Sequence, residues 1–139
     1  MWWWIAACSG GSDVVLTGDT DDDCAGADTF VAGIEVESSG GELVSIVSAE
    51  PTPPDVGDNT WTVAVADASG APMAGLAPVV RPWMPMHGHG LAPPEYVGID
   101  QADGTYVVPT FDLIMPGLWE FTVDLGDGDQ AMFSFCAEG

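Results

Sequence analysis

Glycine and proline recur so often along this chain that a helix has almost nowhere to form. The 139 residues include 18 glycines and 11 prolines, and both types destabilise a helix interior. No window of about eleven residues shows helical apolar spacing without one of them. Between these breakers, apolar residues alternate with polar ones or form short runs, which is typical of strands. An all-β domain is therefore predicted.

The clearest predicted strand is 60–67, in which Trp61, Val63 and Val65 share one face. In the last strand, Met132 and either Phe133 or Phe135 are expected to point inward. The other predicted strands cover 30–37, 43–49, 76–81, 95–100, 105–111, 118–125 and 130–136. About seven to eight short antiparallel strands in one domain indicate a two-sheet β-sandwich.

The N-terminus reads as a lipoprotein signal. Residues 1–8 are apolar and end in Ile-Ala-Ala-Cys, which resembles a lipobox in which Cys8 carries the lipid. The run is short and has no Lys or Arg before it, unlike a full signal peptide. An unprocessed apolar N-terminus is the alternative. Residues 9–28 are predicted to be an acidic flexible linker and 29–139 the folded domain.

The two other cysteines, Cys24 and Cys136, form an even pair in a chain expected to be exported. A disulfide is the default interpretation of such a pair. The alternative is that either thiol binds a metal, although both are far in sequence from the histidines.

The charge of the protein restricts the classes of partner that it can bind. It carries a net −21 with a single Lys or Arg, and phosphate binding needs a basic patch. Nucleic acid is thus excluded, and membrane contact is expected only through the lipid anchor. A cation suits such a field, although the acidity by itself also serves solubility.

One loop contains both histidines, two methionines and the only basic residue of the protein. Residues 81–90 hold both histidines, His87 and His89, together with Met84 and Met86 and the only basic residue, Arg81. Imidazole and thioether groups form a soft ligand set that suits copper better than magnesium or calcium. The spacing of two places both imidazoles on one side of an extended segment.

A family resemblance rests on motifs spread over residues 43–136. They are PDVGDNTWTV at 54–63, DASGAP at 67–72, WMPMHGHG at 83–90, DGTY at 103–106, MPGLW at 115–119 and FC at 135–136. In these motifs the chain resembles the YtkA-like family, which is similar to the FixH-type accessory proteins of bacterial oxidases. The resemblance implies an immunoglobulin-like β-sandwich, exported or membrane-attached, and often linked with copper handling.

The sandwich is expected to bring the loop at 83–90 and the turn at 115–119 together at one end. The candidate metal ligands are His87, His89, Met84, Met86 and Met115, with Trp83 and Trp119 flanking them as covers for the ion. In the competing interpretation the methionines and Trp119 are core, and the histidines orient the loop through hydrogen bonds.

Two functions follow from this sequence. One is a lipid-anchored periplasmic or surface module that binds copper for metal handling or oxidase assembly with a partner in the cell envelope. The other is an interaction module that binds no metal, in which the His-Gly-His-Gly loop is architectural. No catalytic residues are predicted, because no nucleophile elbow, phosphate loop or third ligand at zinc spacing is present.

Overall fold

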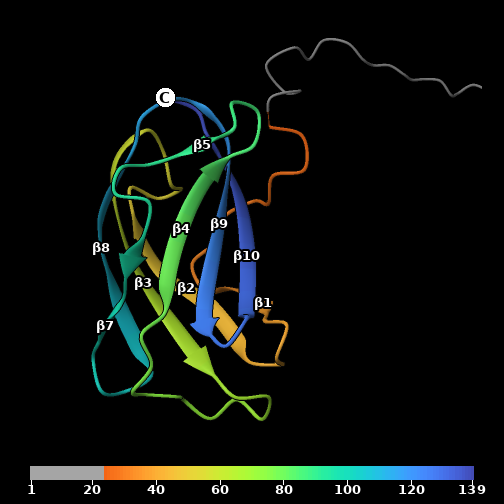
Figure 1. Ribbon diagram of the computed structural model, residues 1–139, viewed down its shortest axis with the longest axis vertical. Coiled ribbons are helices and arrows are strands. Elements are labelled where there is room, and N and C mark those ends of the chain that lie inside the picture. The colour runs from red at the N-terminus through yellow and green to blue at the C-terminus, as the bar shows by residue number, and fades with distance from the viewer. Residues whose placement is uncertain (1–23) are drawn as a thin grey trace, which may run out of the picture.

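The computed structural model describes residues 24–139, and it forms two packed antiparallel sheets (Figure 1). No helix occurs among these residues, so the expected all-β sandwich is confirmed. The first sheet has the order β1-β2-β3-β8-β7, and the second has the order β10-β9-β4-β5 with β6 paired to β4. The strands are β1 Ile34–Glu37, β2 Leu43–Glu50, β3 Gly57–Ala66, β4 Val79–Met84, β5 His89–Gly90, β6 Tyr96–Val97, β7 Ile99–Asp100, β8 Thr105–Leu113, β9 Gly117–Gly126 and β10 Asp129–Ala137.

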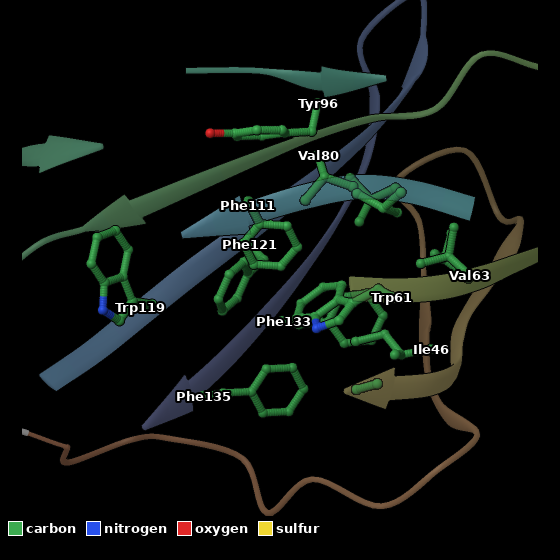
Figure 2. Packing of buried hydrophobic residues seen from close by; sticks show 14 of the residues in the cluster. Ile46, Trp61, Val63, Val80, Tyr96, Phe111, Trp119, Phe121, Phe133 and Phe135 are labelled. Atoms are coloured by element: carbon green, nitrogen blue, oxygen red, sulfur yellow. The ribbon is translucent and has the colours of Figure 1, made fainter. Parts of the chain in front are cut away.

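Alternation along the strands builds the core between the sheets. Every second residue is buried from Asn59 to Val65 in β3 and from Trp119 to Val123 in β9, as the sequence pattern predicts. At the centre lies the indole of Trp61, whose ring centroid is 4.7 Å from that of Phe121 and 5.2 Å from that of Phe111 (Figure 2). Burial of one such side chain contributes about 1.5–3 kcal/mol relative to exposure.

The inward face of β10 differs from the expectation for Met132. Phe133 and Phe135 are both buried, whereas the side chain of Met132 is 50% exposed. Neighbouring residues of a strand point to opposite faces, so Met132 cannot share a face with either phenylalanine. The two rings bury more apolar area than one thioether, and this fixes the strand's orientation.

The number of strands is ten because one predicted strand is divided and one was missed. The chain over 95–100 pairs first with β4 through β6, and then with β8 through β7. It changes sheets at Gly98, where an added Cβ would lie 3.0 Å from Cβ of Tyr106. The missed strand is β5, which is only two residues long.

The described residues begin at Cys24, within the segment 9–28 that the sequence predicts to be a linker. Cys24 and Cys136 form a disulfide with a Cα–Cα distance of 5.4 Å, which confirms the predicted pair and excludes these thiols as metal ligands. The predicted lipobox and Cys8 lie outside the described residues. Nowhere in 24–139 is there a helix long and apolar enough to cross a membrane.

Candidate metal-binding site

The first part of the site is a tight hairpin between β4 and β5. The backbone N–H groups of His87 and Gly88 both donate to the carbonyl of Met84, at 3.2 and 2.8 Å. Gly88 has a φ of +68°, a conformation that side chains rarely adopt. The turn reverses the chain so that β5 pairs antiparallel with β4, and His89 lies directly opposite Met84.

This pairing places the imidazole of His89 on the inner face of the second sheet. Residues that lie opposite each other in a ladder project to the same side, and Met84 is buried at 1% exposure. His89 is half-buried, and its ring lies edge-to-face against the buried indole of Trp119, with centroids 6.0 Å apart. Trp119 therefore closes one side of the histidine.

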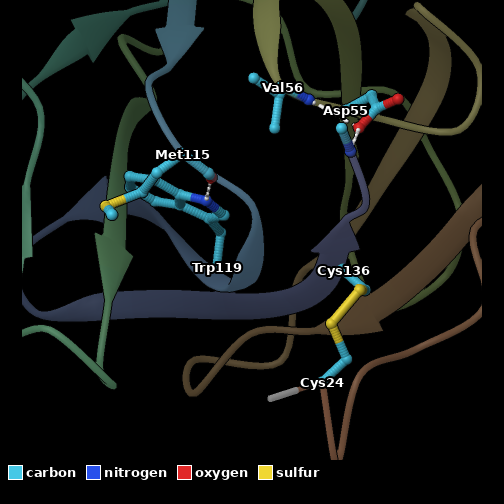
Figure 3. The surroundings of a disulfide bond; sticks show 7 residues. Cys24, Asp55, Val56, Met115, Trp119 and Cys136 are labelled. Carbon is cyan, nitrogen blue, oxygen red and sulfur yellow. Dashed lines mark hydrogen bonds between the residues drawn. A yellow bond between two sulfur atoms is a disulfide. The ribbon is translucent and has the colours of Figure 1, made fainter. Parts of the chain in front are cut away.

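The second part of the site is the turn between β8 and β9. The indole Nε1–H of Trp119 donates to the backbone carbonyl of Met115 at 3.0 Å, which ties this turn to the core (Figure 3). From there the thioether of Met115 reaches His87, with Sδ 3.3 Å from Nδ1. The two distant segments thus meet, as the sequence predicts.

The rings of His87 and His89 lie 5.9 Å apart with an interplanar angle of 29°. Together with Met84 and Met115 they form one cluster of two imidazoles and two thioethers. The exposed Met86 is not part of that contact, but it lines a hollow of about 180 Å³ with Met84, His87, Pro116 and Gly117.

Trp83 lies on the other side of the strand from this cluster. The buried residues of β4 alternate through Val80, Pro82 and Met84, and Trp83 between them is 45% exposed. Of the two flanking indoles, Trp119 is the one beside the histidines.

The donor atoms are compatible with one shared ion. His89 donates from Nδ1 to the carbonyl of Gly90 at 3.0 Å, which leaves the lone pair of Nε2 available. Bonds to zinc are about 2.0 Å long from imidazole nitrogen and about 2.3 Å from thiolate sulfur, and we use these lengths as a guide for an ion held by His87 and Met115. At a separation of 3.3 Å, Nδ1 of His87 and Sδ of Met115 would then meet one ion at about 100°. Without an ion, the same contact is an N–H···S hydrogen bond.

Carboxylates and thiols do not extend this donor set. Within residues 24–139, no group of three or more His, Cys, Asp or Glu side chains is placed to hold a metal. An ion at the loop would therefore depend on the thioethers as well as on the imidazoles.

A second hollow, lined in part by His89, was not predicted. It has a volume of about 470 Å³ and is lined by His89, Gly90, Leu91, Ala92, Tyr96, Asp112 and Ile114. Burial, and then the nearby charge of Asp112, raise the pKa of the Tyr96 hydroxyl above its usual value. These residues come from three segments, and no motif in the sequence links them.

Fold and site together define a small antiparallel β-sandwich with a His/Met cluster at one end. The chain belongs to the YtkA-like family, whose model matches residues 36–124. The match runs from β1 into β9 and includes both loops of the cluster. No curated protein matches the chain.

Proposed function

We propose that this YtkA-like domain binds copper through the cluster of His87, His89 and Met115. The observation that carries the proposal is the 3.3 Å approach of His87 Nδ1 to Met115 Sδ, beside a second imidazole with an available Nε2. Imidazole and thioether ligands favour copper, and thioether favours Cu(I) in particular. A bound copper ion would supply a soft, exchangeable cargo for metal handling.

The protein around the ligands supports binding of this kind. Met84 lies opposite His89 in the ladder, and Trp119 packs edge-to-face against the imidazole of His89. Met86 lies at the mouth of the smaller hollow, where its exposed thioether would meet an arriving ion first. The surrounding net charge of −21 attracts cations.

The test is a comparison of the protein with a His87→Ala/His89→Ala variant by Cu(I) competition titration and thermal melting. A ligand specific to the folded state stabilises it by RT ln(1 + [L]/Kd), or about 2.7 kcal/mol at a hundredfold excess over Kd. The unaltered protein should melt several degrees higher with copper, and the variant should not respond. If the unaltered protein shows no copper-dependent shift, the proposal fails.

We also propose that Cys8 is lipidated and that the domain works at the bacterial cell envelope, on the periplasmic side or the surface. Support comes from the Ile-Ala-Ala-Cys sequence, which resembles a lipobox. Expressed behind an intact signal peptide, the protein should partition into detergent, and Cys8→Ser should remain in the aqueous phase. Equal partitioning of both forms would exclude the anchor. Assembly of an oxidase is the task that the resemblance to FixH-type proteins suggests.

The alternative is an interaction module that binds no metal, and one observation favours it. Trp83, Met86 and Ile114 are 45%, 60% and 58% exposed, and each lies in or beside the two loops. In this case the His87 contact with Met115 would only fix the loops. A His87→Ala/His89→Ala variant that melts much lower without any metal, together with no copper response from the unaltered protein, would support this alternative.

A further inference from the structure

The first described residue, Cys24, lies at the end of the sandwich that carries the His/Met cluster. In the pairing of β9 with β10, Cys136 lies opposite Leu118 and Ala137 lies opposite Gly117. Gly117 is also the residue that closes the turn holding Met115. The disulfide from Cys136 to Cys24 therefore holds Cys24 at the site end of the sandwich (Figure 3).

The direction of residues 24–30 does not depend on the disulfide alone. The backbone N–H of Asp28 donates to the carbonyl of Ser134 at 2.7 Å, and the N–H of Ser134 donates to the Asp28 carboxylate at 3.3 Å. The ring of Phe30 packs edge-to-face on Phe135, with centroids 5.5 Å apart. Residues 24–30 thus lie along β10, and Cys24, the first described residue, lies at the site end of the sandwich.

That end also has an exposed apolar rim. Trp83, Met86 and Ile114 are all largely exposed there, and the hollow of about 470 Å³ opens between His89 and Ile114. We interpret these exposed side chains as parts of one interaction surface, since contiguous apolar patches mark such surfaces. His89 belongs both to this hollow and to the His/Met cluster. A partner bound in the hollow would therefore touch a residue that we propose as a ligand of the ion.

Charge argues against the lipid surface as this occupant. The protein has a net charge of −21 and only one Lys or Arg. That residue, Arg81, is held by Glu95 at 2.8 Å and by Asp124 at 3.0 Å. An anionic leaflet attracts basic segments and repels acidic ones. Of a lipid surface and a protein, the protein is the occupant that this charge favours.

We propose that the chain, anchored through Cys8, presents its metal loops toward the membrane, where they meet a copper-accepting protein embedded in that membrane. The identity of the cargo rests on the proposed copper binding, and the orientation rests on the proposed anchor at Cys8. Residues 9–23 separate the anchor from Cys24, and a chain of about 15 residues spans at most about 50 Å. The opposite end of the sandwich lies a further ~30 Å away, the length of a ten-residue strand.

Orientation is measured on the metal-free full chain. Cys8 is the one thiol outside the disulfide, so it can be coupled to a maleimide lipid in phosphatidylcholine vesicles. A donor dye is attached to an azide-bearing residue that replaces either Ile114, at the site end, or Ala68, in the turn after β3 at the other end. Energy transfer to acceptor lipids should be at least about twofold greater from position 114 than from position 68, because ~30 Å separates them.

A calibration experiment attaches the lipid at the opposite end of the protein. A Cys8→Ser/Ala68→Cys chain, coupled to the same lipid at position 68, should give the opposite order for a dye at position 114 and a dye at Ser69. Equal transfer from the two ends of the Cys8-coupled protein would overturn the proposed orientation. If an environment-sensitive dye at position 114 reports burial in the bilayer, the rim binds lipid, and the protein partner is excluded.

Delivery is tested with a lipid that carries a bicinchoninate headgroup as a membrane-fixed Cu(I) acceptor. Copper should pass from the Cys8-coupled protein to this lipid faster than from the protein coupled at position 68. Equal rates would overturn delivery toward the membrane. Absence of copper binding in the titration would instead remove the proposed function and leave the orientation result standing.

Discussion

The glycines after His87 and His89 act in different ways. Gly88, with φ at +68° and nothing within 4 Å of an added Cβ, serves the turn alone. Gly90 lies in the ladder, where an added Cβ would come within 2.8 Å of the carbonyl oxygen of Pro82. The first glycine reverses the chain, and the second lets the strand that carries His89 approach β4.

At the residue scale, Met115→Leu tests what the thioether of Met115 contributes to copper binding. Leucine is similar in size but has no donor atom, so Cu(I) affinity should fall about tenfold, or ~1.4 kcal/mol, with a smaller loss for Cu(II) because sulfur is the softer ligand. Competition titration of both oxidation states measures the change. Met132→Leu is the matched control, because Met132 is exposed on β10 and outside the cluster. Equal losses in the two variants would contradict a role for Met115 as a ligand.

At the scale of elements, the two-residue strand β5 determines the geometry of the site. It pairs with β4 at only two positions, Trp83 with Gly90 and Met84 with His89. The large core strands do not depend on it, since β4 is held independently by β9. Stability and site geometry are thus separable in this protein.

The variant Gly90→Ala tests whether the pairing of β5 with β4 positions His89. The added methyl group meets a backbone oxygen, which cannot move as a flexible side chain can, so β5 should shift away from β4 and carry His89 with it. We expect a loss of about 1–3 kcal/mol from the strain and a clear loss of copper affinity, measured by denaturation and titration on the same samples.

Gly128→Ala is the control for that experiment. Gly128 has a φ of +81° with nothing within 4 Å of an added Cβ, and it lies in the turn before β10. This change should lower stability through backbone strain and leave copper affinity unchanged. A Gly90→Ala protein with full copper affinity would show that the pairing of β5 does not position His89.

At the scale of the whole molecule, one covalent bond closes nearly the entire folded unit. Cys24 and Cys136 are separated by 112 residues, and long closed loops restrict the unfolded chain most in the chain-entropy model. The bond also joins the segment before β1 to the strand that ends the sandwich. The same bond therefore both stabilises the fold and holds Cys24 at the site end of the sandwich.

Cys24→Ser/Cys136→Ser should lower the free energy of unfolding by about 4–5 kcal/mol in the chain-entropy model. Urea denaturation with and without reductant measures this, because reductant should affect the unaltered protein and not the variant. Cys8→Ser should behave as the unaltered protein does. A variant as stable as the unaltered protein would mean that the pair contributes nothing to folding.

The acidity of the molecule leads to a second prediction at this scale. A net charge of −21 on a compact chain creates self-repulsion, and salt screens it with a Debye length of about 10 Å at 0.1 M. Raising NaCl at pH 7 should therefore raise Tm by several degrees, since about 1 kcal/mol corresponds to ~4–8 °C in a domain of 60–100 residues and ~2–4 °C in one of 150–250 residues. Calorimetry over a salt series would refute this if Tm stayed constant or fell.

The sequence alone determined the sheet architecture and the cysteine pair, for local reasons. Alternation in 60–67 and 118–125 decides which side chains are buried, because a strand has a period of two. Glycine and proline exclude helices wherever they stand. Two cysteines in a chain expected to be exported leave one natural pairing, and the MHGHG and MPGLW motifs located both halves of the candidate site.

Only the tertiary structure decided which of these residues meet. The 3.3 Å contact of His87 with Met115 joins two loops, and no local pattern gives the distance between segments so far apart. Likewise, β5 is too short to show a period, and Met132 and Phe133 compete for one face until packing against the opposite sheet favours the larger ring. The position of Cys24 at the site end follows from the register of β10 on β9. Register depends on how the two sheets fill their common core, which is a property of the whole chain.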